Sequence, residues 1–168
     1  MLGNTYEGQD CAIARSLEVV GERWTLLVLR DALYGVRRFS DFADHLDIPR
    51  AVLADRLRKL VANGVLTRVT PDPDTASAHY ELTDAGRALW PVIHSLARWG
   101  QEHGASARPH RTYAHADCEA TLDVHGHCPV CGVAPEVDSV VTARPREERR
   151  TDRVSVALAQ PHRMLDPI

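Results

Sequence analysis

The chain of 168 residues is poor in aromatic residues, has a single lysine and lacks any long apolar run. Aromatic residues make up only 5% of it, so aliphatic side chains must form most of the core. No apolar run reaches the roughly 18 residues of a membrane-spanning helix, and we expect no membrane partner. Residues 1–10 lack the hydrophobic middle of a signal peptide, which predicts a cytoplasmic protein. Thiols stay reduced there, so the four cysteines are candidates for metal binding or redox chemistry.

Charge is distributed unevenly along the chain. The composition, 44% hydrophobic and 26% charged, is that of a folded domain, and the formal net charge of -3 argues against a general polyanion binder. Between residues 37 and 68, seven Lys and Arg residues stand against four Asp residues, so this segment carries +3 and the remainder -6. All cations except Lys59 are arginines, which suit phosphate and guanine contacts, although a GC-rich genome explains the same preference. One basic segment therefore lies on an otherwise acidic protein.

Apolar periodicity predicts a mainly α fold with a small β-hairpin. Four helices are expected in the first part of the chain, over residues 11–20, 24–34, 41–46 and 49–63. Ser40 is a candidate N-cap for the third helix. Residues 65–70 and 78–82 are expected to form two strands, joined by a turn at 71–77. Thr83 should then cap a long helix that ends near residue 103 and is kinked by Pro91.

The order of these elements is that of a winged helix-turn-helix: a short helix, a tight turn, a second helix with a basic outer face, and a hairpin. Leu53, Leu57 and Leu60 share one face of the helix over residues 49–63, which leaves its other face free to enter a major groove. Three-helix clusters without DNA affinity share this order, so the pattern alone leaves a helical packing domain open.

Several segments between residues 10 and 104 add specific sequence to this pattern. They run from Cys11-Ala-Ile-Ala-Arg-Ser-Leu-Glu-Val-Val-Gly-Glu-Arg-Trp through Arg38-Phe-Ser-Asp-Phe, Leu57-Arg-Lys-Leu-Val-Ala-Asn-Gly-Val-Leu and Tyr80-Glu-Leu-Thr-Asp-Ala-Gly-Arg to Trp99-Gly. In this order and without large gaps, they resemble the HxlR-type transcriptional regulators, which are winged-helix relatives of the MarR group. The match is specific for the family, but it does not indicate a target gene.

The resemblance implies a homodimer that binds palindrome-like double-stranded DNA, with the terminal helices forming the dimer interface. We expect a repressor that responds to a small-molecule or oxidant inducer. The residues expected to contact DNA lie on or beside the recognition helix, at the preceding helix and on the wing. They are Arg38, Ser40, Arg50, Arg56, Arg58, Lys59, Arg68 and His79. For each of them, a side chain that merely faces solvent is the alternative.

Cys11 opens the first helix, where such regulators often carry a cysteine that in some members senses oxidants or electrophiles. A helix N-terminus favours the reactive thiolate, so redox sensing by Cys11 is chemically reasonable. In the family, proline usually follows this cysteine, whereas here Ala12 follows it. Free cysteine is also among the most readily buried residues, so an unreactive, partly buried thiol is the alternative.

Residues 106–143 are rich in cysteine and histidine. Two ligand pairs with two-residue spacers stand nine residues apart: His115 with Cys118, and Cys128 with Cys131. This spacing predicts a zinc-knuckle-like segment whose tetrahedral, structural zinc stabilises a small core of its own. His125 or His127 fits the place of His115 as well. A reduced, empty dithiol or a disulfide is the alternative to zinc.

The chain is therefore expected to contain a winged helix-turn-helix DNA-binding and dimerisation domain over residues 1–105, a zinc-binding extension over 106–143 and a charged, flexible tail over 144–168. No Gly-x-Ser-x-Gly elbow, phosphate loop or His-Glu-x-x-His motif occurs, and we expect no catalytic residue. The predicted function is a dimeric repressor. The alternative is a dimeric scaffold without DNA affinity, in which the zinc-stabilised segment docks a protein partner.

Overall fold

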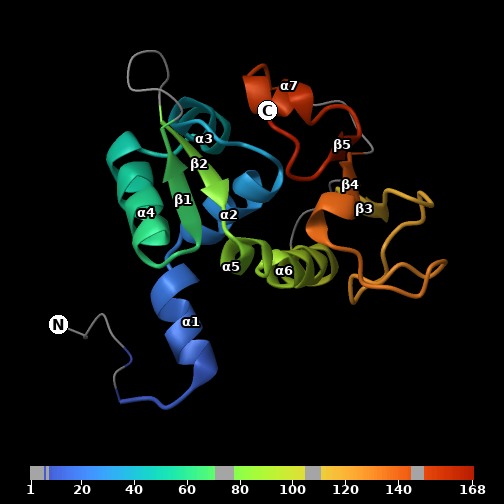
Figure 1. Cartoon of the computed structure of the whole chain (residues 1–168), viewed down its shortest axis with the longest axis horizontal. Helices are drawn as coiled ribbons and strands as arrows, with labels where there is room; N and C mark the ends of the chain where they lie inside the picture. Colours follow the sequence, from blue (N-terminus) through green and yellow to red (C-terminus); the bar gives the residue numbers. More distant parts are fainter. Residues whose placement is uncertain (1–5, 7, 71–77, 105–110, 145–149) are drawn as a thin grey trace.

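The computed structural model describes residue 6 and residues 8–70, 78–104, 111–144 and 150–168 of the chain (Figure 1). Its helices are α1 (Ala12–Val20), α2 (Thr25–Leu33), α3 (Phe39–Leu46), α4 (Arg50–Ala62), α5 (Asp84–Arg87), α6 (Trp90–His103) and α7 (Arg153–Ala157), and a short 3-10 turn spans Val137–Ser139. Its strands are β1 (Leu66–Val69), β2 (His79–Leu82), β3 (Thr112–His115), β4 (Val140–Ala143) and β5 (His162–Arg163). Within the described residues, no helix is long and apolar enough to span a membrane. The expected mainly α fold with a hairpin is confirmed.

The core of the winged helix is aliphatic, as the composition predicts. Leu53, Leu57 and Leu60 of α4 are fully buried against Leu29 of α2 and Phe42 of α3. Burying a leucine side chain stabilises a fold by about 1.5–3 kcal/mol, so these three residues alone hold α4 firmly by one face. The opposite face of α4 is left to solvent.

The wing is an antiparallel pair of strands, in which Leu66 faces Leu82 and Val69 faces His79. Its expected tip, residues 71–77, lies outside the described residues. Arg38 forms an isolated bridge with His79, which joins the segment before α3 to the tip end of the paired strands of the wing. The start of α3 and the wing are therefore fixed to each other through the backbone.

Ser40 is not the N-cap of the third helix. The helix α3 begins at Phe39, and the extended residue Arg38 takes the cap position. Because Arg38 is held in its bridge to His79, the chain leaves an extended segment and enters the helix directly. Ser40 thus lies inside the first turn, with its Oγ 3.5 Å from Oδ1 of Asp41.

The long helix expected after Thr83 is two helices, α5 and α6, separated at residues 88–89. Thr83 caps α5 as predicted, because its Oγ1 accepts a hydrogen bond of 3.2 Å from the backbone N–H of Gly86. Pro91 lies in the first turn of α6, where its missing N–H breaks no helical hydrogen bond. The proline therefore starts a new helix instead of kinking one.

The expectation of a flexible tail is wrong for residues 150–168. Val154 and Leu158 of α7 and the following Met164 are buried, and the backbone N–H of Leu165 donates to the carbonyl of Leu33 over 3.0 Å. The expectation rested on the charged run that ends at Arg153, and the apolar residues beyond that run supply the packing. Residues 145–149 lie outside the described residues.

This packing requires a glycine in the loop after α2. Gly35 has a φ of +89°, and a Cβ atom there would lie 1.7 Å from the carbonyl oxygen of Asp166. The backbone N–H of Ile168 donates to the carbonyl of Gly35 over 3.1 Å. The end of the chain therefore lies directly on the backbone of the winged helix.

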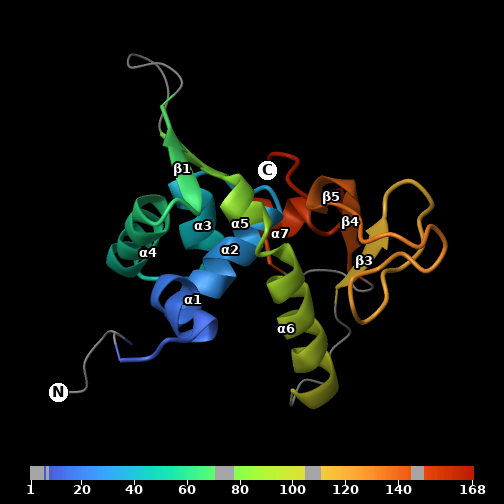
Figure 2. The same ribbon diagram turned by 60° about the horizontal axis from the view of Figure 1, so that its bottom comes forward.

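The Cys/His-rich segment does not have a core of its own. Strands β3, β4 and β5 form one sheet beside α6 (Figure 2), and buried residues of this sheet join the cluster that fills the winged helix. The hydroxyl groups of Tyr34 and Tyr113 lie 2.8 Å apart, and the rings of Trp90 and Tyr113 meet edge to face at 4.9 Å. The segment expected to be independent is thus built onto α2 and α6.

Candidate nucleic-acid interface and metal centre

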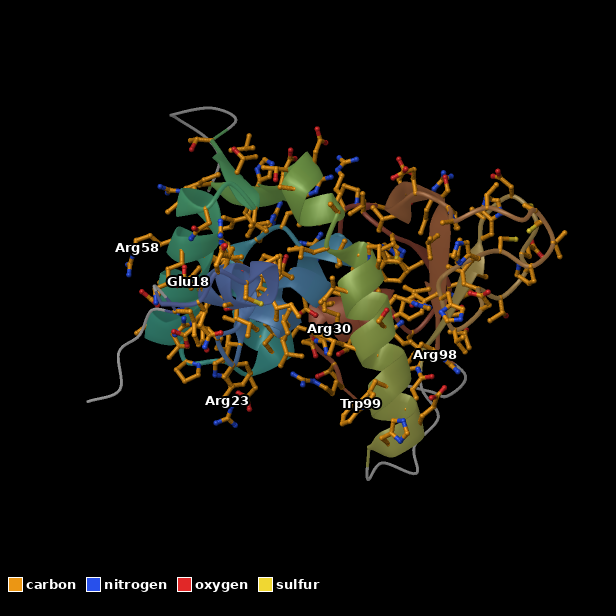
Figure 3. All side chains as sticks on the ribbon, turned by 90° about the horizontal axis from the view of Figure 1, so that it is seen from below. Glu18, Arg23, Arg30, Arg58, Arg98 and Trp99 are labelled. Atoms are coloured by element: carbon orange, nitrogen blue, oxygen red, sulfur yellow. The ribbon has the colours of Figure 1, made fainter. Side chains whose placement is uncertain are left out.

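The outward face of α4 carries the most exposed of the expected contact residues. The side chain of Arg58 is 72% exposed, and it extends from α4 away from the body of the molecule (Figure 3). Lys59 is half-exposed beside it. Asp55 forms ion pairs with both cations, and although burial opposes its charge, Lys59 and Arg58 lower the pKa of Asp55. One carboxylate thus holds two cations in place on the solvent face of α4.

Arg56 does not belong to this face. Its side chain is only 15% exposed, and its Nη1 lies 3.1 Å from Oε1 of Glu22 in the turn between α1 and α2. Arg56 therefore ties α4 to the preceding helices. Helical spacing offered a signal for this, because Arg56 lies three residues after Leu53 and four before Leu60, on the side of α4 that those leucines bury, whereas Arg58 lies on the other side.

The start of α3 continues the basic surface toward the wing. Arg38 and Ser40 are exposed there, and the guanidinium group of Arg50 lies over the ring of Phe39 at 5.3 Å. Since Arg38 is bridged to His79, the start of α4, the start of α3 and the tip end of the wing strands form one connected surface. Such a surface can follow a DNA backbone beside a helix in the major groove.

The wing contributes one exposed cation and one histidine that is paired with an acid. Arg68 on β1 is exposed, whereas His79 on β2 is half-buried. The Nε2 atom of His79 lies 3.1 Å from Oε1 of Glu81, and Arg37 donates to the same oxygen over 2.9 Å. Of the two wing residues expected to contact DNA, Arg68 is thus the one whose side chain is open to a phosphate.

The four expected metal ligands come together in the structure. The ligand atoms of His115, Cys118, Cys128 and Cys131 all lie within 4.8 Å of one another. His115 ends β3 and Cys118 follows in the next turn, while Cys128 and Cys131 share a turn that closes at Gly132, whose φ is +69°. The two further histidines, His125 and His127, lie outside this group.

The distances within the group suit a single small cation. The Sγ atoms of Cys118 and Cys128 are 3.4 Å apart, and Sγ of Cys118 is 3.6 Å from Nδ1 of His115. The other ring nitrogen of His115, Nε2, lies 3.5 Å from Asp117, which is the kind of outer partner that orients a metal-binding histidine. None of the four cysteines is in a disulfide.

Interactions among the thiols of this group shift their pKa values in opposite directions. Although burial opposes it, the backbone N–H of Cys131 and the thiol of Cys118 lower the pKa of Cys128 to about 6. Hydrogen bonds with Cys118 and Cys128 raise the pKa of Cys131 to about 12. A cation at the centre would favour the thiolate form of all three cysteines, so the cluster can bind a metal ion.

Cys11 is exposed at the N-cap of α1, so the expectation of a partly buried thiol is wrong.

A further feature that the sequence did not indicate is a cavity of about 550 Å³ between α2, α6 and the segment after residue 110. Arg30 and Arg111 line it. Because Arg30 and Arg111 are 81 positions apart, no local pattern in the sequence indicated that they meet.

Comparison with known proteins assigns this architecture to a family of regulators. A family model described as HxlR-like helix-turn-helix matches residues 19–108. The HTH-type transcriptional regulator Rv3095 of Mycobacterium tuberculosis is 42% identical over 132 residues, which cover 78% of this chain and 82% of that protein. The HTH-type regulator YtcD of Bacillus subtilis is 30% identical over 95 residues, which cover 56% of this chain and 75% of YtcD. The first alignment is too long to end at residue 108, so the similarity reaches into the Cys/His-rich segment.

Solved structures with a similar fold include a transcription factor and a redox regulator. The transcription factor PA1607 is 37% identical with a TM-score of 0.56, and the match covers 61% of this chain and 71% of PA1607. The redox regulator HypR in its reduced form is 25% identical with a TM-score of 0.52, and the match covers 56% of this chain and 95% of HypR.

Proposed function

The chain belongs to the family of HxlR-like helix-turn-helix transcriptional regulators, and we propose that it acts in the cytoplasm as a homodimeric repressor of palindrome-like operators. As a member of this family it is a DNA-binding transcriptional regulator. The observation that carries the proposed dimer is an apolar surface on the two terminal helices. A dimer seated on an operator occludes the promoter by its bulk and needs no catalytic activity.

The apolar surface lies on α1 and α6. Ile13 on α1 is 70% exposed and Trp99 on α6 is 63% exposed, and Leu17 and Val92 on the same two helices are exposed as well. Exposed apolar side chains gathered on terminal helices are typical of a surface that another chain covers. A second copy supplies the same surface and generates the two-fold symmetry that a palindrome mirrors.

The proposed DNA surface lies on α3, α4 and the wing. Arg58 and Lys59 would enter the major groove with α4, while the cations at the start of α3 and α4 and on β1 would hold phosphates. The proposed contact residues are Arg38, Ser40, Arg50, Arg58, Lys59, Arg68 and His79. Arg56 is left out of this set because its side chain is only 15% exposed, whereas that of Lys59 is half-exposed.

The experiment that tests the function is the selection of bound duplexes from a random library by the full chain. We expect an inverted repeat, bound with an affinity that falls steeply as salt rises, because cations that bind phosphates release counterions. A protein-docking scaffold would select no sequence and show no duplex affinity, and that outcome would contradict the proposal.

We further propose that the metal centre holds one structural zinc ion. Three thiolates and one imidazole form a closed tetrahedral set, which leaves no position for a reactive water. Elemental analysis of protein purified without chelators is expected to give about one zinc per chain. A ratio near zero, with Cys128 and Cys131 titrating as free thiols, would contradict this assignment.

Cys11 supports oxidant sensing as a second function. Its thiol is exposed at the start of α1, a helix of the proposed dimer surface, so that its modification would affect the assembly that binds DNA. The similar structure of the redox regulator HypR supports the same interpretation.

A further inference from the structure

One cavity in the described structure has the size and the lining of a small-molecule site. Its volume is about 550 Å³, within the range of roughly 300–1,000 Å³ that such sites occupy. One wall is a single face of α6, since its lining residues recur at helical spacing: Ile93, Leu96, Ala97, Gly100 and Gln101. Leu26 and Leu27 of α2 form the opposite apolar wall. Figure 2 shows α2 and β3 on either side of α6.

The polar part of the lining is strongly basic. Arg30, Arg111 and Arg144 line the cavity, and within the described residues no Asp or Glu does. The Nη2 atom of Arg111 donates to the carbonyl of Leu158 over 3.1 Å, while its Nη1 is buried without a hydrogen-bond partner among the described residues. A buried guanidinium N–H without an acceptor is costly, so the fold holds Arg111 beside the cavity with one hydrogen bond unmade.

The guanidinium group of Arg111 lies over the ring of Tyr34, 5.3 Å from its centroid, but no carboxylate among the described lining residues balances its charge. Burial lowers the pKa of Arg111, Tyr34 opposes this shift, and the positive charges of Arg144 and Arg30 add to it. An anion in the cavity would reduce the repulsion among the three arginines. The apolar walls require that the rest of the ligand be apolar.

We propose that this cavity binds a small organic acid with a compact apolar body, such as an aromatic ring, and a single carboxylate that Arg111 holds. A guanidinium group binds a carboxylate through paired, charge-assisted hydrogen bonds. The leucines of α2 and α6 cover the apolar body. Phosphates and sugars suit this cavity less, because they would leave its apolar walls in contact with polar groups.

The cavity is linked to the DNA-binding helices by a short chain of charged groups. Nε and Nη2 of Arg30 donate to Oδ1 of the buried Asp31 over 2.9 and 2.7 Å, and Oδ2 of Asp31 lies 2.6 Å from Nδ1 of His45 on α3. A carboxylate near Arg30 competes with Asp31 for its charge and thereby acts on α3, which precedes α4. The ligand would then change operator affinity, a step that rests on the proposed function.

The site is specific to chains that carry the C-terminal segment. Arg111, Tyr113 and Arg144 all lie beyond residue 108, where the match to the family model ends. The winged helix alone would therefore provide the apolar wall, Arg30 and the polar side chains of Tyr34, His45 and Gln101, but neither Arg111 nor Arg144.

The test measures binding of benzoate and 2-naphthoate to the free, zinc-loaded full chain by calorimetry, with benzamide as the uncharged comparison. We expect saturable binding of the carboxylates and at least about tenfold weaker binding of benzamide. Arg111→Gln is expected to weaken carboxylate binding about tenfold or more. Arg23→Gln removes an exposed arginine that extends away from α6 (Figure 3), and it should leave binding within about twofold of the unchanged chain.

A second variant keeps the proposal testable if Arg111→Gln fails to fold. A Cβ atom at Gly100 would meet no heavy atom within 4 Å, so Gly100→Leu fills the cavity without a clash and favours the helix. It should abolish carboxylate binding while the dimer remains intact.

Three results would overturn the proposal: no saturable binding of either carboxylate to the unchanged chain, equal binding to Arg111→Gln, or loss of the dimer in Gly100→Leu. The last result would show that the partner chain fills the cavity. Because carboxylate binding is measured without DNA, the first two results are independent of the proposed function, whereas the third depends on the proposed dimer. Release of the selected operator by saturating benzoate supports the link to α3, and unchanged operator affinity contradicts that link.

Discussion

Arg56 and Arg58 stand two residues apart on α4, but their side chains have opposite environments. Arg58→Ala is expected to weaken operator binding by about 1–3 kcal/mol if Arg58 contacts a base, because the variant removes an exposed cation without opening the core. A phosphate contact would instead lower affinity evenly and reduce the salt slope. Fluorescence anisotropy with the selected operator at several salt concentrations measures both effects.

Arg56→Ala is the matched control, because it removes the same kind of charge from the same helix. We expect a loss of up to about 1 kcal/mol in the free energy of unfolding, since the link to Glu22 is lost, and a smaller effect on operator binding than in Arg58→Ala. If Arg58→Ala binds the operator as tightly as the unchanged chain, the outer face of α4 is not the DNA surface.

Cys11 provides a second test at the residue scale. An exposed thiol at a helix start should react with diamide or a quinone before the four clustered ligands, which a bound metal shields. Treatment is therefore expected to release the operator from the unchanged chain but not from Cys11→Ser. Mass spectrometry identifies the modified residue. Release of the operator while Cys11 stays unmodified would exclude it as the sensor.

Among the elements, the short helix α7 attaches the C-terminal residues to the core. Asp152 caps it by accepting a hydrogen bond of 2.9 Å from the backbone N–H of Ser155, and Leu158 at its end is completely buried. We expect Leu158→Ala to lower the free energy of unfolding by about 2–5 kcal/mol, the cost of a cavity in a packed core. Urea unfolding followed by circular dichroism measures this loss.

Val156 on the same helix supplies the comparison, since its side chain is 59% exposed. Val156→Ala should change the free energy of unfolding by no more than about 0.5 kcal/mol. If both variants are equally stable, residues 150–168 do not contribute to the core in solution.

At the scale of the whole molecule, the two parts of the chain share one core. Removing the metal with a chelator is therefore expected to lower the melting temperature of the entire chain, because Tyr113 packs against Tyr34 and Trp90. A loss of 1 kcal/mol corresponds to about 2–4 °C for a chain of this size. Calorimetry should show one transition that moves, and adding zinc back should restore it. Separate melting of an unchanged winged helix would contradict a shared core.

The dimer is the other property of the whole molecule. Trp99→Glu places a charge at the most exposed apolar side chain of α6, and we expect it to yield monomers that bind the operator weakly. Sedimentation analysis measures the assembly. Val124→Glu, which alters an exposed apolar residue of the Cys/His-rich segment, should leave the dimer intact. A dimeric Trp99→Glu variant would place the interface elsewhere.

Local patterns in the sequence were sufficient to predict the winged helix and the group of metal ligands. The leucines at positions 53, 57 and 60 lie on the buried face of α4, as their spacing predicts, since that spacing is a property of the helix itself. In the same way, the two-residue spacers of the ligand pairs bring each pair together within a single turn. The ends of helices could not be predicted in the same way. The start of α3, for example, follows the bridge between Arg38 and His79, two residues that are far apart in the sequence.

The tertiary structure alone decided the features that depend on contacts between distant parts of the chain. Leu165 pairs with Leu33, Tyr113 with Tyr34, and the cavity joins Arg30 to Arg111, although each pair is separated by about 80 residues or more. The prediction of a flexible tail rested on the charged residues that precede α7. The average composition of a segment does not show which of its single side chains are buried, and the apolar residues of α7 were missed for that reason. The sequence by itself thus determined which face of each helix is apolar. Long-range packing determined which other segments cover those faces, because contacts between side chains far apart in the sequence produce no periodic pattern.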